Sequence, residues 1–307
     1  MSEERTGLVI ASHGRRILVE TAQGERVPCA IQGRDLQIHC GDEVRWRRDT
    51  ATDRGIATER LPRRSVLERT NAHGGTEVVV ANLTHLIVVV APEPVADFFI
   101  VDRFLAAAEL AGIAAMIVRN KLDLPAPPDV DEELANYAAI GYPYIVASTL
   151  HNTGIEELAQ RLAGQRSVLV GQSGVGKSSL ANALVPGLGA ATAELSAATE
   201  EGKHVTSVST LHHLPGGGDL IDSPGVRDFA PAIERIGRAA DAFREIAALA
   251  GQCRFSDCRH LREPDCAVLG AVEEGRIKQR RYESFKRLGR LREQLTPAPG
   301  PRQRQRR

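Results

Sequence analysis

The chain has 307 residues, 42% of them hydrophobic, and its 39 Lys and Arg residues balance 39 Asp and Glu residues. This length allows two or three domains with a proper core, and the zero net charge does not by itself point to nucleic acid. The N-terminus has no secretory leader, and the most apolar region, Val78 to Val101, is broken by polar residues and prolines. We therefore expect neither secretion nor a membrane span.

The five cysteines indicate the compartment in which the protein folds. Three of them lie near the C-terminus beside a histidine, and the count is odd. This pattern argues against a secreted disulfide scaffold and favours reduced thiols, so we expect a cytoplasmic protein. Cys29 and Cys40 belong to no such cluster and are expected to be core residues of the N-terminal domain.

Residues 1–70 have the pattern of short strands separated by glycine turns, which predicts a small β-barrel with the OB-fold as the leading candidate. The predicted strands are Gly7–Ile10, Arg16–Ala22, Glu25–Ile31, Glu43–Arg48 and Gly55–Leu61. Arginines 45, 47, 48 and 54 would suit a nucleic-acid face. Barrel rims are also charged for solubility alone, so both interpretations stay open.

Residues 71–229 alternate apolar strand-like runs with helical stretches, which predicts a doubly wound, mostly parallel sheet covered on both faces. The predicted strands are His85–Ala91, Ala114–Val118, Tyr144–Ala147, Ser167–Val170 and Asp219–Ile221. The predicted helices are Val95–Ala111, Glu132–Ala139, Gly154–Ala163 and Lys177–Val185. Pro186–Pro215 lacks apolar periodicity, and we expect a long functional or mobile loop there.

Residues 230–295 are predicted to form a helical domain interrupted by a Cys/His cluster, and residues 296–307 a disordered basic tail. From Arg276 onward about a dozen Lys and Arg residues face only Glu283 and Glu293. This locally basic end suits an anionic partner. A solvated helix with a frayed Arg-rich tail would have the same composition.

The sharpest motif is Gly171 to Ser178, which matches G-x4-G-K-[ST] between a predicted strand and a predicted helix. Its backbone N–H groups would surround phosphate oxygens at a helix N-terminus. Lys177 would neutralise the β- and γ-phosphates, and Ser178 would ligate Mg²⁺. A chance glycine-rich loop would not be expected in this context.

Two further loops predict selection of the base. Asn120, Lys121 and Asp123 form an N-K-x-D sequence after a predicted strand. The Asp123 carboxylate can accept both N1–H and N2–H₂ of guanine, a pair that adenine does not offer. Lys121 would cover the base, Asn120 would tie this loop to the phosphate loop, and the Ala147-Ser148 backbone would meet guanine O6.

A third loop is expected to sense the γ-phosphate. Asp222 and Gly225 belong to the sequence D-S-P-G that follows a predicted strand. Asp222 would hold Mg²⁺ and the Gly225 N–H would contact the γ-phosphate, although Asp also starts ordinary turns. Thr206, between the two phosphate-binding motifs, would close over Mg²⁺ as a switch residue.

Near the C-terminus, three thiolates and one imidazole have the spacing C-x4-C-x-H-x5-C. The residues are Cys253, Cys258, His260 and Cys266. Four protein ligands leave no position for water, so this pattern predicts one structural Zn²⁺ site. Three buried thiols with an incidental histidine are the alternative.

The order of these motifs, with N-K-L-D before the P-loop and D-S-P-G after it, is that of a GTPase cut open and rejoined. Together with an N-terminal barrel and a C-terminal Cys/His module, it resembles the ribosome small-subunit-dependent GTPase A family over nearly the whole chain. The resemblance implies a circularly permuted GTPase domain flanked by an OB-fold and a zinc-binding domain. It also implies GTP hydrolysis coupled to the small ribosomal subunit, in its late maturation.

The resemblance extends to the hydrolytic residues. The family reads Gly-Arg/Lys-His-Thr-Thr in the segment of the switch threonine, and this chain departs from that pattern at Val205, which precedes Thr206. Val226 follows Gly225 where many GTPases carry a water-orienting glutamine, so unaided hydrolysis should be slow. His204 is the candidate that the resemblance offers for activating water, and a surface-loop histidine is the alternative.

The sequence thus predicts a monomeric, Mg²⁺-dependent GTPase that binds the small ribosomal subunit and its rRNA through the barrel and the basic Arg276–Arg292 helix. The predicted catalytic residues are Lys177, His204 and Thr206. The predicted nucleotide-binding residues are Asn120, Lys121, Asp123, Ala147, Ser148, Gly171, Gln172, Ser173, Gly174, Val175, Gly176, Lys177, Ser178, Ser179, Asp222 and Gly225. Two alternatives stay open: a non-ribosomal regulatory GTPase whose flanking modules bind a protein, and an RNA-binding module that uses GTP as a structural ligand with little turnover.

Overall fold

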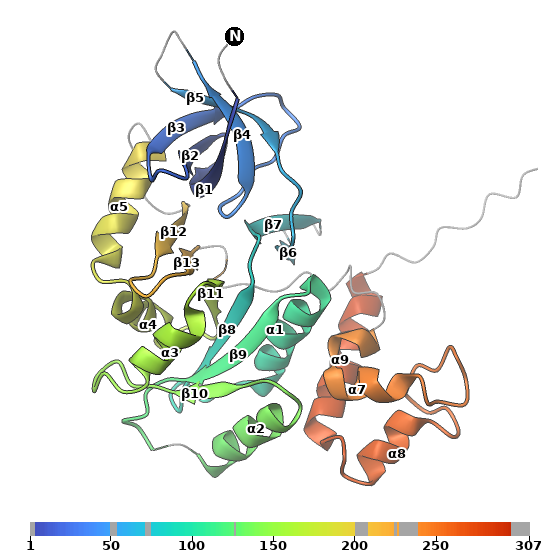
Figure 1. Cartoon of the computed structure of the whole chain (residues 1–307). Helices are drawn as coiled ribbons and strands as arrows, with labels where there is room; N and C mark the ends of the chain where they lie inside the picture. The colour runs from blue at the N-terminus through green and yellow to red at the C-terminus, as the bar shows by residue number, and fades with distance from the viewer. Residues whose placement is uncertain are drawn as a thin grey trace, which may run out of the picture. The chain divides into compact units, whose positions relative to one another are not determined.

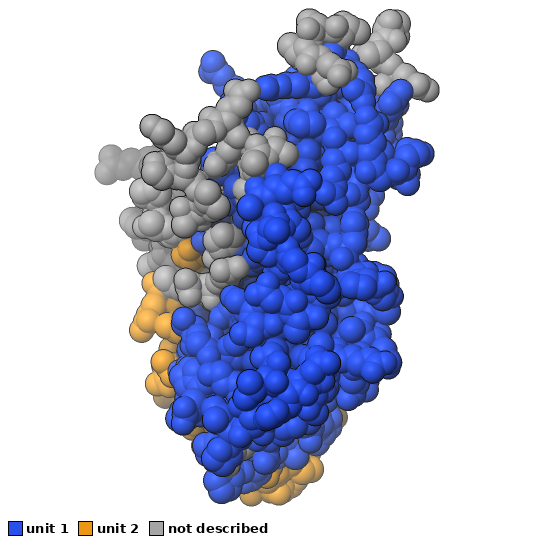
Figure 2. Space-filling view, turned by 90° about the vertical axis from the view of Figure 1, so that its left-hand side faces the viewer, with its two compact units in different colours: residues 1–69, 76–231 blue, residues 70–75, 232–307 orange. Residues whose placement is uncertain are grey.

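The computed structural model describes most of the chain, in two compact units (Figures 1 and 2). One unit comprises residues 1–69 and 76–231, and the other residues 70–75 and 232–307. The described residues are 4–49, 54–70, 75–125, 127–199, 208–223, 226 and 239–295. No helix among them is long and apolar enough to cross a membrane.

The N-terminal strands form a closed barrel, as the sequence predicted. They are β1 (Arg5–His13), β2 (Arg16–Glu20), β3 (Arg26–Ile31), β4 (Glu43–Arg48) and β5 (Gly55–Arg60). Their order is β1-β2-β3-β5-β4, and a further pairing of β4 with β1 closes the cylinder. Only the β3–β5 pair is parallel. A barrel of this kind leaves none of its five strands with a fully unpaired edge.

Alternating apolar positions on these strands fill the barrel with side chains. Trp46 is fully buried at its centre, and Cys29 lies in the same cluster. Burial raises the pKa of the Cys29 thiol to about 12, so this residue is an inert core thiol. Cys40 is also buried, but it packs in the cluster shared with the central sheet and not in the barrel interior.

The central sheet has five parallel strands in the order β10-β9-β8-β11-β13. The strands are β8 (His85–Val90), β9 (Ala114–Arg119), β10 (Tyr144–Val146), β11 (Arg166–Val170) and β13 (Asp219–Asp222). All five runs that the sequence predicted are therefore strands. Because they are parallel, their carboxyl ends lie along one edge, where the predicted nucleotide motifs begin.

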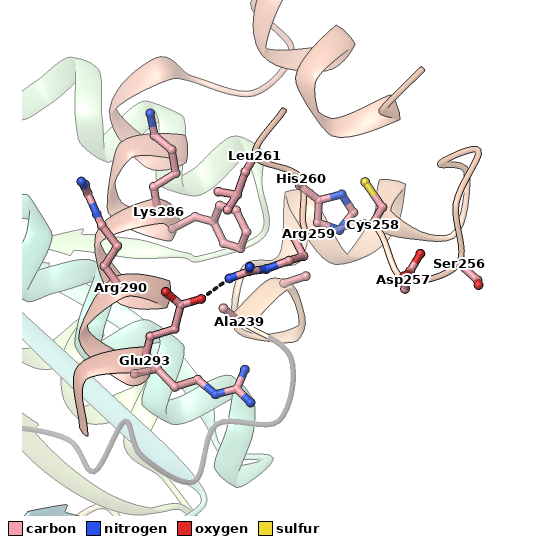
Figure 3. Close-up of a pocket in the computed structure, with 14 residues that line it drawn as sticks. Ala239, Ser256, Asp257, Cys258, Arg259, His260, Leu261, Lys286, Arg290 and Glu293 are labelled. Carbon is pink, nitrogen blue, oxygen red and sulfur yellow. Dashed lines mark hydrogen bonds and ion pairs between the residues drawn. The ribbon is translucent and has the colours of Figure 1, made fainter. Parts of the chain in front are cut away.

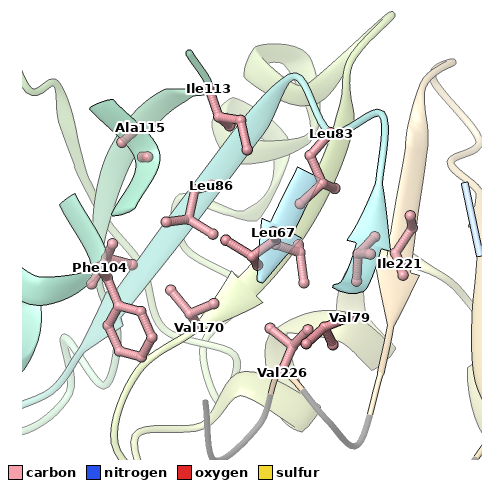
Figure 4. Packing of buried hydrophobic residues seen from close by; sticks show 14 of the residues in the cluster. Leu67, Val79, Leu83, Leu86, Phe104, Ile113, Ala115, Val170, Ile221 and Val226 are labelled. Carbon is pink, nitrogen blue, oxygen red and sulfur yellow. The ribbon is translucent and has the colours of Figure 1, made fainter. Parts of the chain in front are cut away.

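Helices cover both faces of this sheet, as the doubly wound prediction requires. Along β8, Leu86 and Val88 face one apolar cluster, whereas Ile87 and Val89 face the other. The first cluster includes residues of α1 (Phe98–Ala111) and α2 (Pro128–Ala139), and Figure 4 shows part of it. The second includes residues of α3 (Ile155–Leu162) and α4 (Lys177–Leu184). An uninterrupted apolar strand is what burial on both faces demands.

The predicted long loop Pro186–Pro215 was wrong in part, because the structure has helix α5 (Leu188–Thr199) and strand β12 (Ser209–His213) there. The helix is rich in Ala, which favours helix without giving an amphipathic period. β12 pairs antiparallel with β13 on one side and with β1 of the barrel on the other. Barrel and central sheet therefore form one continuous eleven-stranded sheet.

Two short strands, β6 (Val66–Thr70) and β7 (Thr76–Ala81), form a separate two-stranded sheet that the sequence did not predict. Leu67 and Val79 pack from it into the core of the central sheet.

The second unit is helical, as predicted. Its described elements are a 3₁₀ helix η1 (Ala239–Ala242), α7 (Arg244–Ala250), α8 (Ala267–Glu273) and α9 (Gln279–Leu295). Its core contains the buried ion pair of Arg281 with Glu245, 2.7 Å between Nε and Oε1. The Arg281 guanidinium also lies over the Phe243 ring, 4.7 Å from its centroid.

Candidate nucleotide site and Cys/His centre

The predicted P-loop lies between β11 and α4, the position that phosphate binding requires. Gly176 precedes the helix with φ of 93°, in the left-handed region. The Lys177 ammonium donates to the carbonyl oxygens of Gly171 and Gln172, at 2.7 and 2.8 Å. These bonds hold the ammonium across the loop.

Two glycines of this loop have no room for a side chain. A Cβ on Gly171 would lie 2.2 Å from the carbonyl oxygen of Val89, and one on Gly176 would lie 2.2 Å from Asn120 Nδ2. Both positions also have positive φ. The loop therefore closely approaches strand β8 and the Asn120 side chain that follows β9, and glycine is the residue that fits at both contacts.

The N-K-x-D loop is bonded to the P-loop, as expected for Asn120. The buried Asn120 side chain donates to the carbonyl of Val175 at 3.0 Å. Its Oδ1 is buried without a hydrogen-bond partner among the described atoms, so the amide has acceptor capacity left for a ligand or water. Lys121 follows with φ of 57°, and its ammonium donates to the carbonyl of Glu93 at 2.6 Å.

The predicted guanine-binding carboxylate lies against the Ala147-Ser148 turn. The Ser148 hydroxyl donates to Asp123 Oδ1 at 2.5 Å, and this bond lowers the Asp123 pKa below its ordinary value. The Leu122 N–H donates to the carbonyl of Ala147 at 3.0 Å. The two loops are thus held together, with an ionised, exposed carboxylate at their junction.

The two predicted Mg²⁺ ligands lie close together although they are 44 positions apart in sequence. Lys177, Ser178 and Asp222 line one small cavity of about 20 Å³, between the start of α4 and the end of β13. A space of this size accommodates one water molecule or ion. Oxygen ligands of this type suit Mg²⁺, so the residues present fit the metal that the motif implies.

Three predicted residues, His204, Thr206 and Gly225, lie outside the described part of the chain. Val226 is described, and it is only 1% exposed. Its side chain packs in the core cluster with Val79 and Val170 and not against solvent (Figure 4).

The four predicted zinc ligands converge in the second unit, with all ligand atoms within 4.8 Å of one another. Nδ1 of His260 lies 3.4 Å from Sγ of Cys253 and 3.5 Å from Sγ of Cys266, and these sulfurs are 3.8 Å apart. Tetrahedral Zn²⁺, with bonds of about 2.3 Å to sulfur and about 2.0 Å to nitrogen, spaces its ligands about 3.5–3.8 Å apart. The donor set therefore fits zinc.

The surroundings of this cluster hold the ligands in place. His260 adopts φ of 59°, and its carbonyl accepts from the Tyr282 hydroxyl at 2.7 Å. Burial acts to raise the pKa of Cys253, but hydrogen bonds with the backbone N–H groups of Ala267 and Val268 and with the neighbouring cysteines together outweigh it and keep that pKa below the ordinary value. Such donors stabilise a thiolate, which is the ligating form.

Comparison with protein families identifies the family of this chain. The model of the RsgA GTPase family matches residues 60–231, more than half of the chain. The chain belongs to the RsgA GTPase family. Proteins called small ribosomal subunit biogenesis GTPase RsgA are similar throughout. The one from Pseudomonas aeruginosa is 41% identical over 291 residues, covering 94% of this chain and 86% of the relative. The one from Azotobacter vinelandii is 41% identical over 295 residues, with the same coverage.

Solved structures agree on the fold. YjeQ from Thermotoga maritima is 33% identical, with a TM-score of 0.76 over 94% of this chain and 99% of that one. YloQ, described as a circularly permuted GTPase, has a TM-score of 0.73 over 97% of this chain and 98% of its own, at 22% identity. The permuted GTPase fold inferred from motif order is therefore confirmed for this RsgA-family chain.

Sequence reasoning missed one part of the site, the loop between β8 and α1. The Asp97 N–H donates to Oε1 of Gln172 at 2.9 Å, while the Asp97 carboxylate caps α1 by accepting from the N–H of Phe99 at 2.9 Å. Glu93, in the same loop, accepts from Lys121. This segment of the RsgA-family chain joins the P-loop, the base-recognition loop and a helix. The sequence signal that could have revealed this loop is its position directly after β8, the strand that pairs with the P-loop strand β11.

Proposed function

We propose that this protein is a GTP-hydrolysing switch that acts on the small ribosomal subunit during its biogenesis. The observation that carries the proposal is the junction of three motifs at one sheet edge, marked by the Asn120–Val175 hydrogen bond and by the cavity shared by Ser178 and Asp222. Family membership and the printed names of the relatives support the biological setting.

Each motif has a defined task in this proposal. Asp123 accepts from guanine N1–H and N2–H₂, Lys121 covers the base, and the backbone after Ala147 donates to O6. The P-loop N–H groups and Lys177 bind the β- and γ-phosphates. Mg²⁺, held by Ser178 and Asp222, would neutralise charge that develops on the phosphates during transfer to water.

Hydrolysis without a partner should be slow. Val226 occupies the position where a glutamine would orient water, and its side chain is in the apolar core. A valine there neither donates to nor accepts from water. We therefore assign water activation to His204 or to a group supplied by the ribosomal subunit, with Thr206 closing over the metal and the Gly225 N–H contacting the γ-phosphate.

The flanking parts are assigned to RNA contact and zinc binding. The spacing of the Cys253, Cys258, His260 and Cys266 ligand atoms supports one structural Zn²⁺. The barrel and the basic helix α9 would contact rRNA phosphates, which makes binding strongly salt-dependent. On the barrel, Arg45 pairs with Glu59, which favours the solubility interpretation for that one arginine.

The test is steady-state GTP hydrolysis by the purified protein, alone and with isolated small or large ribosomal subunits, with Lys177→Ala as the blank. We expect a slow basal rate and strong stimulation by the small subunit only. Equal slow rates under all three conditions would contradict the proposal and favour a regulatory GTPase with a protein partner. Weak salt dependence of ribosome binding would argue against the RNA contacts specifically.

A further inference from the structure

The second unit contains a groove that the GTPase site does not use. It has a volume of about 610 Å³ and lies between α9 and the loop 256–261 (Figure 3). Its apolar lining comes from Leu261, Phe285, Ala239 and Ala240. Leu261 is 43% exposed, whereas Phe285 is buried and forms the floor. An apolar hollow of this size on a small helical unit is suited to a ligand with a flat, apolar part.

The rim of the groove is cationic. Four basic side chains and two acidic ones line it: Arg259, Lys286, Arg290, Arg292, Asp257 and Glu293. Glu293 and Arg259 neutralise each other in an ion pair, and Lys286 is paired with Glu283 at 2.7 Å, so four basic side chains against these two glutamates and Asp257 leave a surplus of one positive charge. Lys286 and Arg290 are four residues apart on α9, so their side chains lie one above the other along the helix. The surplus of positive charge calls for an anionic ligand.

We propose that this groove binds a single unpaired nucleotide of an RNA strand. The base would lie in the apolar hollow beside Leu261, and the flanking phosphates would contact Lys286 and Arg290. This inference rests on the proposed function, and it adds a recognition mode that neither duplex binding nor a uniform basic surface provides. Unpaired bases are recognised by stacking on aromatic side chains or guanidinium planes, and extruded bases also by insertion between aromatic or apolar side chains.

Other occupants fit the groove less well. An acidic peptide would satisfy the basic rim, but its carboxylates have no use for the apolar floor. A phosphate ion alone would also leave the exposed Leu261 side chain uncovered. The combination of floor and rim therefore favours a nucleotide, which has a planar base and an adjacent phosphate.

Because of the Arg259–Glu293 ion pair, the proposal also predicts a substitution that strengthens RNA binding. The Arg259 and Glu293 side chains are both exposed, so an incoming phosphate would compete with Glu293 for the Arg259 guanidinium. Replacing Glu293 by Gln should therefore strengthen RNA binding, by roughly two- to fivefold. Glu274→Gln is the matched control, because Glu274 is equally exposed and paired with Arg276 but does not line the groove.

The experiment uses the zinc-loaded full chain and fluorescence anisotropy with a short labelled single-stranded RNA, intact or with one abasic position at its centre. For the wild type, we expect the abasic RNA to bind roughly tenfold more weakly. Leu261→Ala should weaken binding of the intact RNA and abolish the difference between the two RNAs. Arg290→Ala should weaken both, whereas Arg287→Ala, exposed on the same helix outside the groove, should have little effect.

Three outcomes would overturn the proposal. The first is equal binding of the intact and abasic RNAs to the wild type. The second is a loss of binding in Arg287→Ala as large as that in Arg290→Ala, and the third is displacement of the RNA by an acidic peptide at a lower concentration than unlabelled RNA requires. Zinc content and circular dichroism of each variant show whether Leu261→Ala has kept its fold. GTP hydrolysis with small subunits, measured in parallel, separates the two failures. Loss of nucleotide recognition with intact stimulation rejects the groove alone, and absent stimulation rejects the proposed function.

Discussion

Gly176→Ala is expected to break the contact between the phosphate loop and the base-recognition loop. The added Cβ would lie 2.2 Å from Asn120 Nδ2, so the Asn120 side chain must leave its bond to Val175. Moving the amide relieves the crowding but leaves a buried polar group without its bond, and either result, persistent crowding or the lost bond, costs about 1–3 kcal/mol. The left-handed φ of 93° costs a further 1–2 kcal/mol or so.

Together the contact and backbone effects remove about 2–5 kcal/mol, a large part of the roughly 5–15 kcal/mol that stabilises a typical domain. The matched control is Gly187→Ala, because Gly187 also has a left-handed φ of 78° but nothing within 4 Å of an added Cβ. It should lose only the backbone contribution of about 1–2 kcal/mol. Urea unfolding of both variants measures the difference.

A fluorescent GDP analogue provides a second reading on whatever Gly176→Ala protein remains folded. We expect its affinity to fall strongly, because the loops that hold base and phosphate no longer keep their spacing. The reasoning is refuted if Gly176→Ala is destabilised no more than Gly187→Ala. It is also refuted if combining Gly176→Ala with Asn120→Ala gives fully additive losses, since residues in contact should couple.

Three other outcomes follow from the site and its surroundings. Burial acts to lower the pKa of His213, but hydrogen bonds to Glu20 and Asp219 outweigh this effect and raise the pKa above 6.5. The substitution His213→Gln should therefore destabilise the protein fully below about pH 6.5, and the loss should fade as pH rises through the raised pKa. Urea unfolding at a series of pH values measures this dependence. Asp123→Asn should lose GTP affinity by a factor of at least about a hundred and gain affinity for xanthosine triphosphate, measured by competition binding, and equal affinity for GTP would contradict the guanine contact. Removing zinc with a strong chelator should unfold the helical unit, seen as lost helical circular dichroism, while GDP affinity stays unchanged; unaltered helicity would contradict a structural metal.

The parallel strands and the P-loop could be predicted because local sequence determines them. A run such as His85–Val90 is apolar at nearly every position, which only a strand buried on both faces requires. β12, in contrast, has a single large apolar residue, Leu211, and is a strand because it has partners on both sides. Tertiary pairing overrides weak local preference in β12. α5 was missed for a different reason: its alanines favour helix, but it lacks the amphipathic period from which a helix is predicted.

Some residues of the candidate site could likewise be predicted from the sequence, and others could not. The spacing of the P-loop and of the Cys/His ligands is itself the signal, so their residues could be named in advance. The contact of Asp97 with Gln172 joins segments 75 residues apart, and nothing in either segment indicates the other. The burial of Val226 likewise depends on β7, an element the sequence did not predict.

The shared strand pairing at the junction of barrel and sheet limits how this protein can be cut. Because β1 covers one side of β12, a chain shortened to begin after the barrel would expose a row of unpaired N–H and C=O groups along β12. Exposed strand edges pair with other chains, so such a fragment would be prone to self-association even with its nucleotide motifs intact. The barrel thus protects the GTPase sheet from aggregation, and gain or loss of this N-terminal part would have to be accompanied by a new cover for that edge.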